Sequence, residues 1–159
     1  MPAAPPPVLI CFDDSPGAAR AVSEAANLFP GAEAIVVHVW QPLEATFAYR
    51  YSAAGVTGAL EEQIREVDAA GQDAAQAIAE RGAELARQAG LSAEARAIKV
   101  DDSEAVAVRA AAEQVDARVI VMGSRQLGAI QAMALGGFSH AVLQASERPV
   151  LIVPAPAGP

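Results

Sequence analysis

Residues 8–16 read Val-Leu-Ile-Cys-Phe-Asp-Asp-Ser-Pro, and this stretch decides the fold. Its first five residues form a continuous apolar run, which is typical of a strand buried on both faces of a parallel sheet. Ser15 and Pro16 suit the start of a helix, because serine can accept an unpaired backbone N–H and proline lacks one. The stretch therefore predicts a buried strand that leads directly into a helix.

The same alternation of strand and helix continues along the chain. Further strands are expected at residues 34–40, 93–100, 119–122 and 150–153, and helices at 16–29, 58–89, 104–115 and 137–145. Gly71 and Gly82 lie on the apolar stripe of the 58–89 helix, which indicates close packing against the sheet. The segment 41–57 has no clear period, and we expect it to be partly helical or mobile. This alternation predicts an α/β fold with an open, doubly wound, five-stranded parallel sheet covered by helices on both faces.

Composition indicates a single globular domain. The chain has 159 residues, of which 53% are hydrophobic and 19% are charged. We expect one domain over residues 8–154, with flexible tails at 1–7 and 155–159. The formal net charge of −8 disfavours binding to nucleic acids or anionic membranes. Because no apolar run approaches the ~20 residues of a membrane span and the N-terminus does not resemble a signal peptide, the cytoplasm is the expected compartment.

Several chemistries lack the residues they need. One cysteine and two histidines cannot form a closed Cys/His zinc site. Lys99 is the only lysine, and Asp101 stands where a P-loop requires Ser or Thr. His38 lies in an apolar run and is expected to be a packed core residue. We therefore predict no metal site and no catalytic residues, and a slow ATPase is the only enzyme hypothesis that remains.

Polar and glycine residues cluster where a ligand would bind. Open parallel sheets bind ligands beyond the carboxyl ends of their strands. The residues that leave those ends are Asp13 and Asp14, Val39 and Trp40, residues 100–102, and residues 123–125. Gly136 and Gly137 add backbone N–H donors at a predicted helix start, which can hold an anion. An apolar slot, an acidic acceptor and a glycine-rich loop together favour a nucleotide.

The sequence resembles the universal stress protein family over about residues 7–154. The resemblance rests on the motifs Phe12-Asp13-Asp14-Ser15, Val37-His38-Val39, Val-Ile-Val-Met-Gly-Ser-Arg at 119–125, and Gly136 followed by Arg-Pro-Val-Leu-Ile-Val at 148–153. It implies the strand order 3-2-1-4-5. It also implies a homodimer, formed in many members by antiparallel pairing of the last strands, here Val150–Val153. Such pairing would protect an open sheet edge.

Many members of this family bind ATP through the motif Gly-x-x-Gly-(nine residues)-Gly-Ser/Thr. The resemblance and the strand ends together assign a cofactor site to Asp13, Val39, Gly123, Ser124, Arg125, Gly136, Gly137 and Ser139. Asp13 would meet the nucleoside, and Val39 would line the adenine slot. Gly123 and Gly136 match the first and third motif glycines, and Ser139 offers a hydroxyl two residues beyond the Ser/Thr position.

Five positions depart from the family pattern. Gln126 replaces the second motif glycine, and Gly137 stands at the Ser/Thr position. Val100 and Asp14 each replace a glycine of the family pattern, and Asp102 replaces a proline. A side chain at position 126 obstructs the close approach of phosphate, and added carboxylates repel it. We therefore expect a non-catalytic stress-response dimer with a degenerate adenine-nucleotide site, in which ATP binding is weak, altered or lost.

Two alternatives remain open. The protein is an ATP-binding switch, with Mg²⁺ as a companion ion, if Gln126 swings clear of the phosphates. Alternatively, the crevice binds another kind of small molecule, with Trp40 and the 41–57 segment as a lid. The cofactor is therefore ATP, another adenine nucleotide or none, and the protein partner beyond a second copy is unknown.

Overall fold

A computed structural model describes residues 4–44, 58–124 and 137–155 of the chain. The elements are β1 (Val8–Cys11), α1 (Pro16–Leu28), β2 (Glu33–Trp40), α3 (Gly58–Gln88), β3 (Ser92–Lys99), α4 (Glu104–Gln114), β4 (Val119–Gly123), α6 (Gly137–Ala145) and β5 (Val150–Val153). The strands form one parallel sheet in the order β3-β2-β1-β4-β5. The predicted fold and strand order are confirmed.

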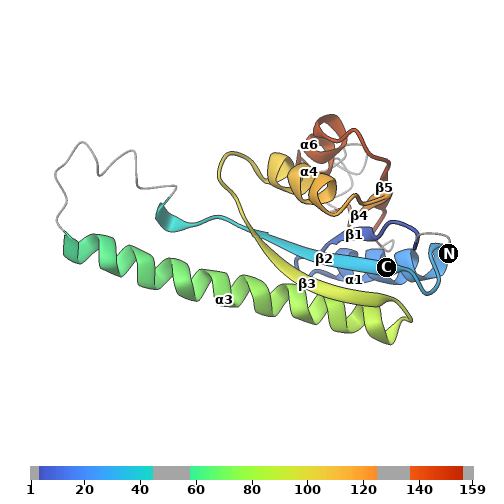
Figure 1. Ribbon diagram of the computed structural model, residues 1–159, viewed down its shortest axis with the longest axis horizontal. Helices are drawn as coiled ribbons and strands as arrows, with labels where there is room; N and C mark the ends of the chain where they lie inside the picture. Colours follow the sequence, from blue (N-terminus) through green and yellow to red (C-terminus); the bar gives the residue numbers. More distant parts are fainter. Residues whose placement is uncertain (1–3, 45–57, 125–136, 156–159) are drawn as a thin grey trace.

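Helices cover the sheet on both faces. In Figure 1, α1 and α3 lie below the sheet, and α4 and α6 lie above it. Side chains alternate along each strand, so Val8 and Ile10 pack toward α1 and α3, whereas Leu9 and Cys11 pack toward α4 and α6. The core therefore consists of two apolar layers, one on each side of the sheet.

Two serines begin the helices that follow β1 and β3. The Ser15 hydroxyl accepts a hydrogen bond of 3.1 Å from the N–H of Ala18, and Pro16 is the first residue of α1. The Ser103 hydroxyl accepts one of 3.2 Å from the N–H of Val106. These N-caps fix the direction in which each helix leaves the carboxyl edge of the sheet.

The glycines of α3 allow close packing, as predicted. A Cβ on Gly82 would lie 2.6 Å from the Phe12 ring, so only glycine allows α3 to approach β1 this closely. A Cβ on Gly71 would lie 3.3 Å from the Trp40 ring. The helix ends before Gly90, whose φ of +98° is readily adopted only by glycine.

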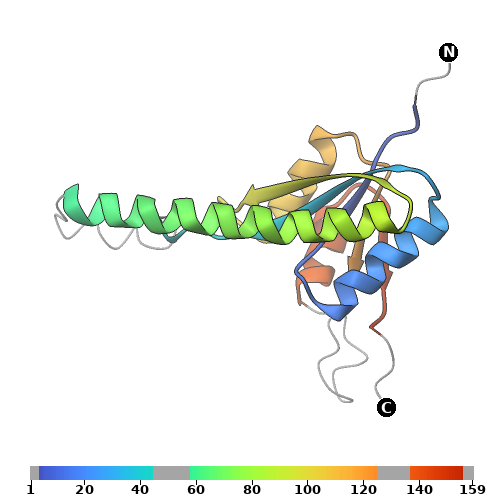
Figure 2. The same cartoon turned by 90° about the horizontal axis from the view of Figure 1, so that it is seen from below.

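The 31-residue helix α3 projects beyond the sheet, as Figure 2 shows. Its buried residues begin at Ala75, so the first turns extend past the core. The Asp68 carboxylate accepts hydrogen bonds of 2.6 and 3.1 Å from the N–H groups of Leu43 and Glu44, which ties the chain after β2 to this helix. Residues 45–57 of the segment predicted to be partly helical or mobile lie outside the described residues.

Side chains from α3 cover the outer edge of β3. The Gln76 amide donates to the carbonyl of Ala95 (3.3 Å) and accepts from the N–H of Ala97 (2.9 Å). Arg87 donates to the carbonyl of Ala93 at 3.0 Å. These bonds use backbone groups that would otherwise pair with another strand. Within the described ranges, no helix has the length and apolar character needed to cross a membrane.

Candidate functional site

A cavity of about 110 Å³ opens where β1, β2 and β4 end. Strand order reverses at β1, and ligands of doubly wound sheets bind at such a point. The cavity is lined by Cys11, Phe12, Asp13, Ser15, Ala18, Val37, His38, Val39, Glu104, Met122, Gly123, Ser124 and Phe138. Its walls are mostly apolar, and carboxylate, hydroxyl and imidazole groups lie among them.

Four of the predicted site residues meet in this cavity. Asp13 follows β1, Val39 lies near the end of β2, and Gly123 and Ser124 lie at the end of β4. The parallel topology brings them together although they are distant in sequence.

The other predicted residues lie elsewhere. Gly137 is exposed at the start of α6, and Ser139 is buried, with 3% of its surface exposed. Neither residue lines the cavity, although their neighbour Phe138 does. Arg125 and Gly136 lie outside the described residues, as does Gln126.

The turn after β1 separates the two aspartates. Asp13 lines the cavity, and its carboxylate accepts a hydrogen bond of 3.1 Å from the N–H of Ser15. Asp14 has a φ of +65°, the left-handed region that favours glycine, and glycine is the residue that the family resemblance implies here. Its carboxylate pairs with Arg81 of α3 at 2.7 Å and does not line the cavity.

Neither of the two added aspartates lines this cavity. That Asp14 and Asp102 place negative charge near a polyphosphate stays a prediction, because residues 125–136, which include the predicted phosphate loop, lie outside the described residues. Asp102 lines a separate, larger cavity, and Val100 is buried. The second carboxylate in the cavity wall is instead that of Glu104, in the first turn of α4.

Gly123 has a packing role that does not depend on a ligand. A Cβ at this position would lie 2.5 Å from the carbonyl oxygen of Gly17, so the end of β4 touches the backbone of α1. The adjacent Ser124 donates its N–H to the carbonyl of Val153 at 2.8 Å, and its hydroxyl accepts from Ala155 at 3.3 Å. These contacts fix the position of the β4 end in the cavity wall.

Sequence reasoning missed His38, Glu104 and Phe138 as lining residues. The Nδ1 atom of His38 lies 2.8 Å from the carbonyl oxygen of Phe12. Because a carbonyl only accepts, Nδ1 carries the hydrogen, and the ring links the ends of β1 and β2. His38 is thus half-buried and also lines the cavity, whereas a purely core role was expected. In the sequence, all three residues lie near the end of a predicted strand or at the start of a predicted helix, and this position could have indicated them.

Trp40 does not take the lid position that one alternative requires. Its ring lies against Gly71 of α3, and it is absent from the cavity wall. The rest of that hypothetical lid falls in residues 45–57, outside the described part of the chain.

The buried thiol of Cys11 forms part of the cavity wall. Burial, and to a smaller extent the negative charge of Asp13, raise the pKa of Cys11 to about 12. The thiol is therefore neutral near pH 7 and a poor nucleophile. Among the residues that the structure describes, no group of three or more His, Cys, Asp or Glu side chains is arranged to hold a metal ion.

The strand order and the helices on both faces define a doubly wound α/β protein, with a cavity at the carboxyl ends of its strands. The sequence pattern of the universal stress protein family matches residues 6–154. The chain is also 30% identical over 148 residues to the universal stress protein YxiE of Bacillus subtilis, an alignment that covers 92% of this chain and 97% of that protein. The protein therefore belongs to the universal stress protein family.

Solved structures share its fold. A universal stress protein in complex with cAMP is 24% identical, with a TM-score of 0.63, and the match covers 96% of this chain and 99% of that one. The universal stress protein from Archaeoglobus fulgidus in complex with dAMP is 21% identical, with a TM-score of 0.61 and coverage of 95% and 99%. These similarities establish a common architecture over nearly the whole chain.

Proposed function

We propose that the protein is a non-catalytic, cytoplasmic stress-response dimer that binds an adenine nucleotide with few phosphates and binds ATP weakly or not at all. The observation that carries this proposal is the pair of carboxylates, Asp13 and Glu104, in the wall of the cavity at the strand ends. The cAMP and dAMP complexes of proteins with the same fold support adenine nucleotides as the ligand class.

Size and charge both favour a small nucleotide. The cavity, about 110 Å³, is smaller than the roughly 300 Å³ at which typical ligand pockets begin. It suits the base of a nucleotide better than a whole ATP molecule. Two like charges about 6 Å apart repel by roughly 3 kcal/mol at an effective dielectric constant near 20. Since ATP carries more negative charge than AMP, the two carboxylates disfavour ATP more strongly.

The dimer is proposed to form through β5. The other sheet edge, β3, already has backbone groups bonded to Gln76 and Arg87 of α3. In a parallel ladder, alternate residues direct their backbone groups to opposite sides. The carbonyl groups of Pro149 and Val153 accept from β4, so Val150 and Ile152 direct theirs toward the outer edge. Antiparallel pairing with a second copy would satisfy them and give a closed two-fold assembly.

Isothermal titration of ligand-free protein with AMP, cAMP and ATP in excess Mg²⁺ tests the ligand. We expect AMP or cAMP to bind at micromolar concentration and ATP to bind at least about tenfold more weakly, a difference of about 1.4 kcal/mol. ATP binding with a Kd below about 10 μM would contradict the degenerate site and identify an ATP-binding switch. No heat from any adenine nucleotide at millimolar concentration would identify a site for a different small molecule.

Sedimentation equilibrium tests the dimer. A Leu151→Pro variant serves poorly, because the backbone of Leu151 faces β4. The Ile152 side chain packs against the α4 and α6 layer, but its backbone N–H faces the outer edge. The better variant is therefore Ile152→Pro, which removes that N–H. We expect it to sediment as a monomer while keeping the wild-type circular dichroism spectrum. A variant that remains dimeric would place the interface elsewhere.

A further inference from the structure

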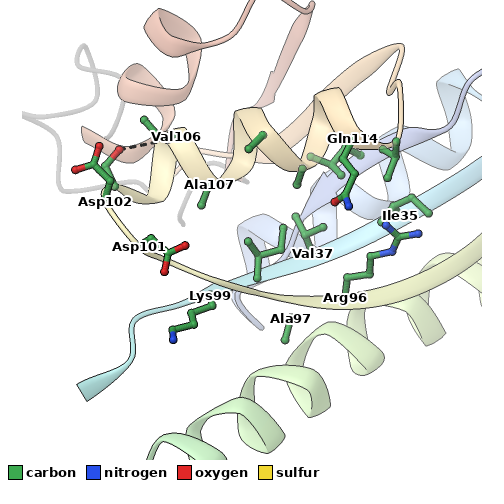
Figure 3. A pocket seen from close by; sticks show the side chains of 16 residues that line it. Ile35, Val37, Arg96, Ala97, Lys99, Asp101, Asp102, Val106, Ala107 and Gln114 are labelled. Atoms are coloured by element: carbon green, nitrogen blue, oxygen red, sulfur yellow. Dashed lines mark hydrogen bonds between the residues drawn. The ribbon is translucent and has the colours of Figure 1, made fainter. Parts of the chain in front are cut away.

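A second, larger cavity lies between α4 and the strands β2 and β3, of which β3 is an edge of the sheet. Its volume is about 520 Å³, which is within the range of small-molecule sites. It exists because α4 buries Ala105, Val108 and Ala112 in the core and presents several alanines, among them Ala107, toward the cavity. Figure 3 shows Ala107 pointing down from α4 into the space above the strands.

The floor of this cavity is apolar. It is formed by Leu9, Ile35, Val37 and Ile98, which belong to the sheet face that packs toward α4. The first three are almost fully buried, whereas Ile98 is only partly buried. Larger side chains on α4 would fill the space above them. An aliphatic ligand would gain hydrophobic free energy mainly by covering the partly exposed Ile98 and the partly exposed Val106 and Ala107 of α4.

The two ends of the cavity differ in charge. In Figure 3, Arg96 and Gln114 lie together at one end, and Asp101 and Asp102 lie at the other. Arg96 makes an ion pair with Glu94 at 3.7 Å, which is too long for a hydrogen bond. A guanidinium has five N–H donors and can bind a carboxylate through two of them, and the Gln114 amide can add another.

We propose that this cavity binds an anionic amphiphile, an aliphatic chain with a terminal carboxylate. The chain lies along the apolar floor, and the carboxylate binds Arg96. The two aspartates repel the anion from the opposite end, where Lys99 also lines the cavity but its side chain points away from α4 (Figure 3). Charge thus sets the orientation. The 11 residues of α4 span roughly 16 Å, enough for a medium-length fatty acid to lie parallel to the helix.

This site is distinct from the proposed nucleotide site. Among the described lining residues, the two cavities share only Val37, and none of the predicted nucleotide-site residues that the structure describes lines the larger one. The larger cavity also contains the guanidinium group that the smaller cavity lacks among its described lining residues. The fatty-acid proposal therefore does not depend on nucleotide binding.

Titration with decanoate, below its micelle concentration, tests the proposal, with decan-1-ol as a ligand of the same length and no charge. We expect decanoate to bind with 1:1 stoichiometry per chain. Ala107→Leu should weaken the binding of both ligands, because the longer side chain occupies part of the space above the strands. Arg96→Gln should lower the affinity for decanoate at least tenfold and leave the affinity for decan-1-ol unchanged. Arg65→Gln, which removes the same charge from the projecting part of α3, is the matched control and should bind like the wild type.

Four outcomes would overturn the proposal. They are the absence of decanoate binding at millimolar concentration, equal affinity of Arg96→Gln and the wild type, competition between decanoate and AMP, and a change of oligomeric state in Ala107→Leu. Competition with AMP would make the cavity part of the nucleotide site, and a changed oligomeric state would assign it to a second copy of the chain. Unfolding temperatures of all variants within a few degrees of the wild type exclude misfolding as the cause of lost binding.

Discussion

The guanidinium group of Arg81 holds the carboxylate of Asp14 through two hydrogen bonds, 3.0 Å from Nε and 2.7 Å from Nη2. This contact ties the turn after β1 to the middle of α3, across 67 positions of sequence. The contact also directs the negative charge of Asp14 toward α3. The sequence had suggested that this charge lies near a phosphate group. The cavity at the strand ends thus contains one carboxylate from this turn, that of Asp13.

The first prediction concerns the left-handed conformation of Asp14. Its φ of +65° costs a non-glycine residue on the order of 1–2 kcal/mol. Asp14→Gly relieves this strain and loses the Arg81 contact, whereas Asp14→Ala loses the contact and keeps the strain. We therefore expect the glycine variant to have the larger free energy of unfolding of the two, by about 1 kcal/mol, in urea denaturation. Equal stability of the two variants would show that the turn relaxes in solution.

The second prediction concerns the contact between β4 and α1. A Cβ on Gly123 would lie 2.5 Å from the Gly17 carbonyl oxygen, so Gly123→Ala should destabilise the fold by about 2–3 kcal/mol and disturb the cavity. Gly137→Ala is the matched control, because a Cβ there meets nothing within 4 Å. It should be neutral or stabilise α6 by up to about 1 kcal/mol. Thermal unfolding of both variants measures the difference, and similar melting temperatures would contradict the packing role of Gly123.

Much of the fold was predictable because its determinants are local. The apolar run at residues 8–12 and the capping serines Ser15 and Ser103 act within a few residues, so the sequence alone located β1, α1 and α4. Four site residues were also predictable, because parallel topology places the carboxyl ends of the strands at one edge of the sheet.

The remaining features depend on how distant elements are placed against one another. Glu104 lines the cavity only because α4 starts above the end of β2, and no local pattern gives that position. The resemblance assigned Gly123 to phosphate binding. The structure shows that position 123 must also lack a side chain because it packs against the backbone of Gly17. The contact between Asp14 and Arg81 joins residues whose side chains suggest only solvated surface.

The third prediction restores the missing hydroxyl of the nucleotide motif. Gly137 is exposed at the start of α6, and no atom of the described residues lies within 4 Å of a Cβ placed there, so Gly137→Ser introduces a hydroxyl without a clash against them. One added hydrogen bond to a phosphate contributes about 0.5–1.5 kcal/mol, so ATP affinity should rise roughly three- to tenfold. Gly137→Ala, titrated in parallel, should leave the affinity unchanged. An equal gain from alanine would mean that helix stability, and not the hydroxyl, changes binding.

The fourth prediction concerns the ionisation of Cys11. Burial raises its pKa from 9.0 to about 12, so the unfolded chain releases this proton at a lower pH than the folded protein. The contribution to stability is complete below about pH 9 and is lost as pH rises toward 12. Between about pH 8 and pH 10, the free energy of unfolding of the wild type should fall by about 1.4 kcal/mol more than that of Cys11→Ala. Parallel pH profiles in urea denaturation would show that the thiol is accessible to solvent.

The fifth prediction separates charge from shape in the proposed nucleotide site. Glu104→Gln keeps the size of the side chain that lines the cavity and removes its negative charge. Since repulsion between the carboxylate and the ligand grows with the number of phosphates, ATP affinity should rise about tenfold or more and AMP affinity should rise less. Glu113→Gln, on the far end of α4 and outside this cavity, removes an equal charge and serves as the control. Titration at low and at high salt completes the measurement, because the difference between ATP and AMP should shrink as salt screens the charge. An equal gain for both nucleotides would assign the effect of Glu104 to a contact with the nucleoside, and the preference for few phosphates would then need another cause.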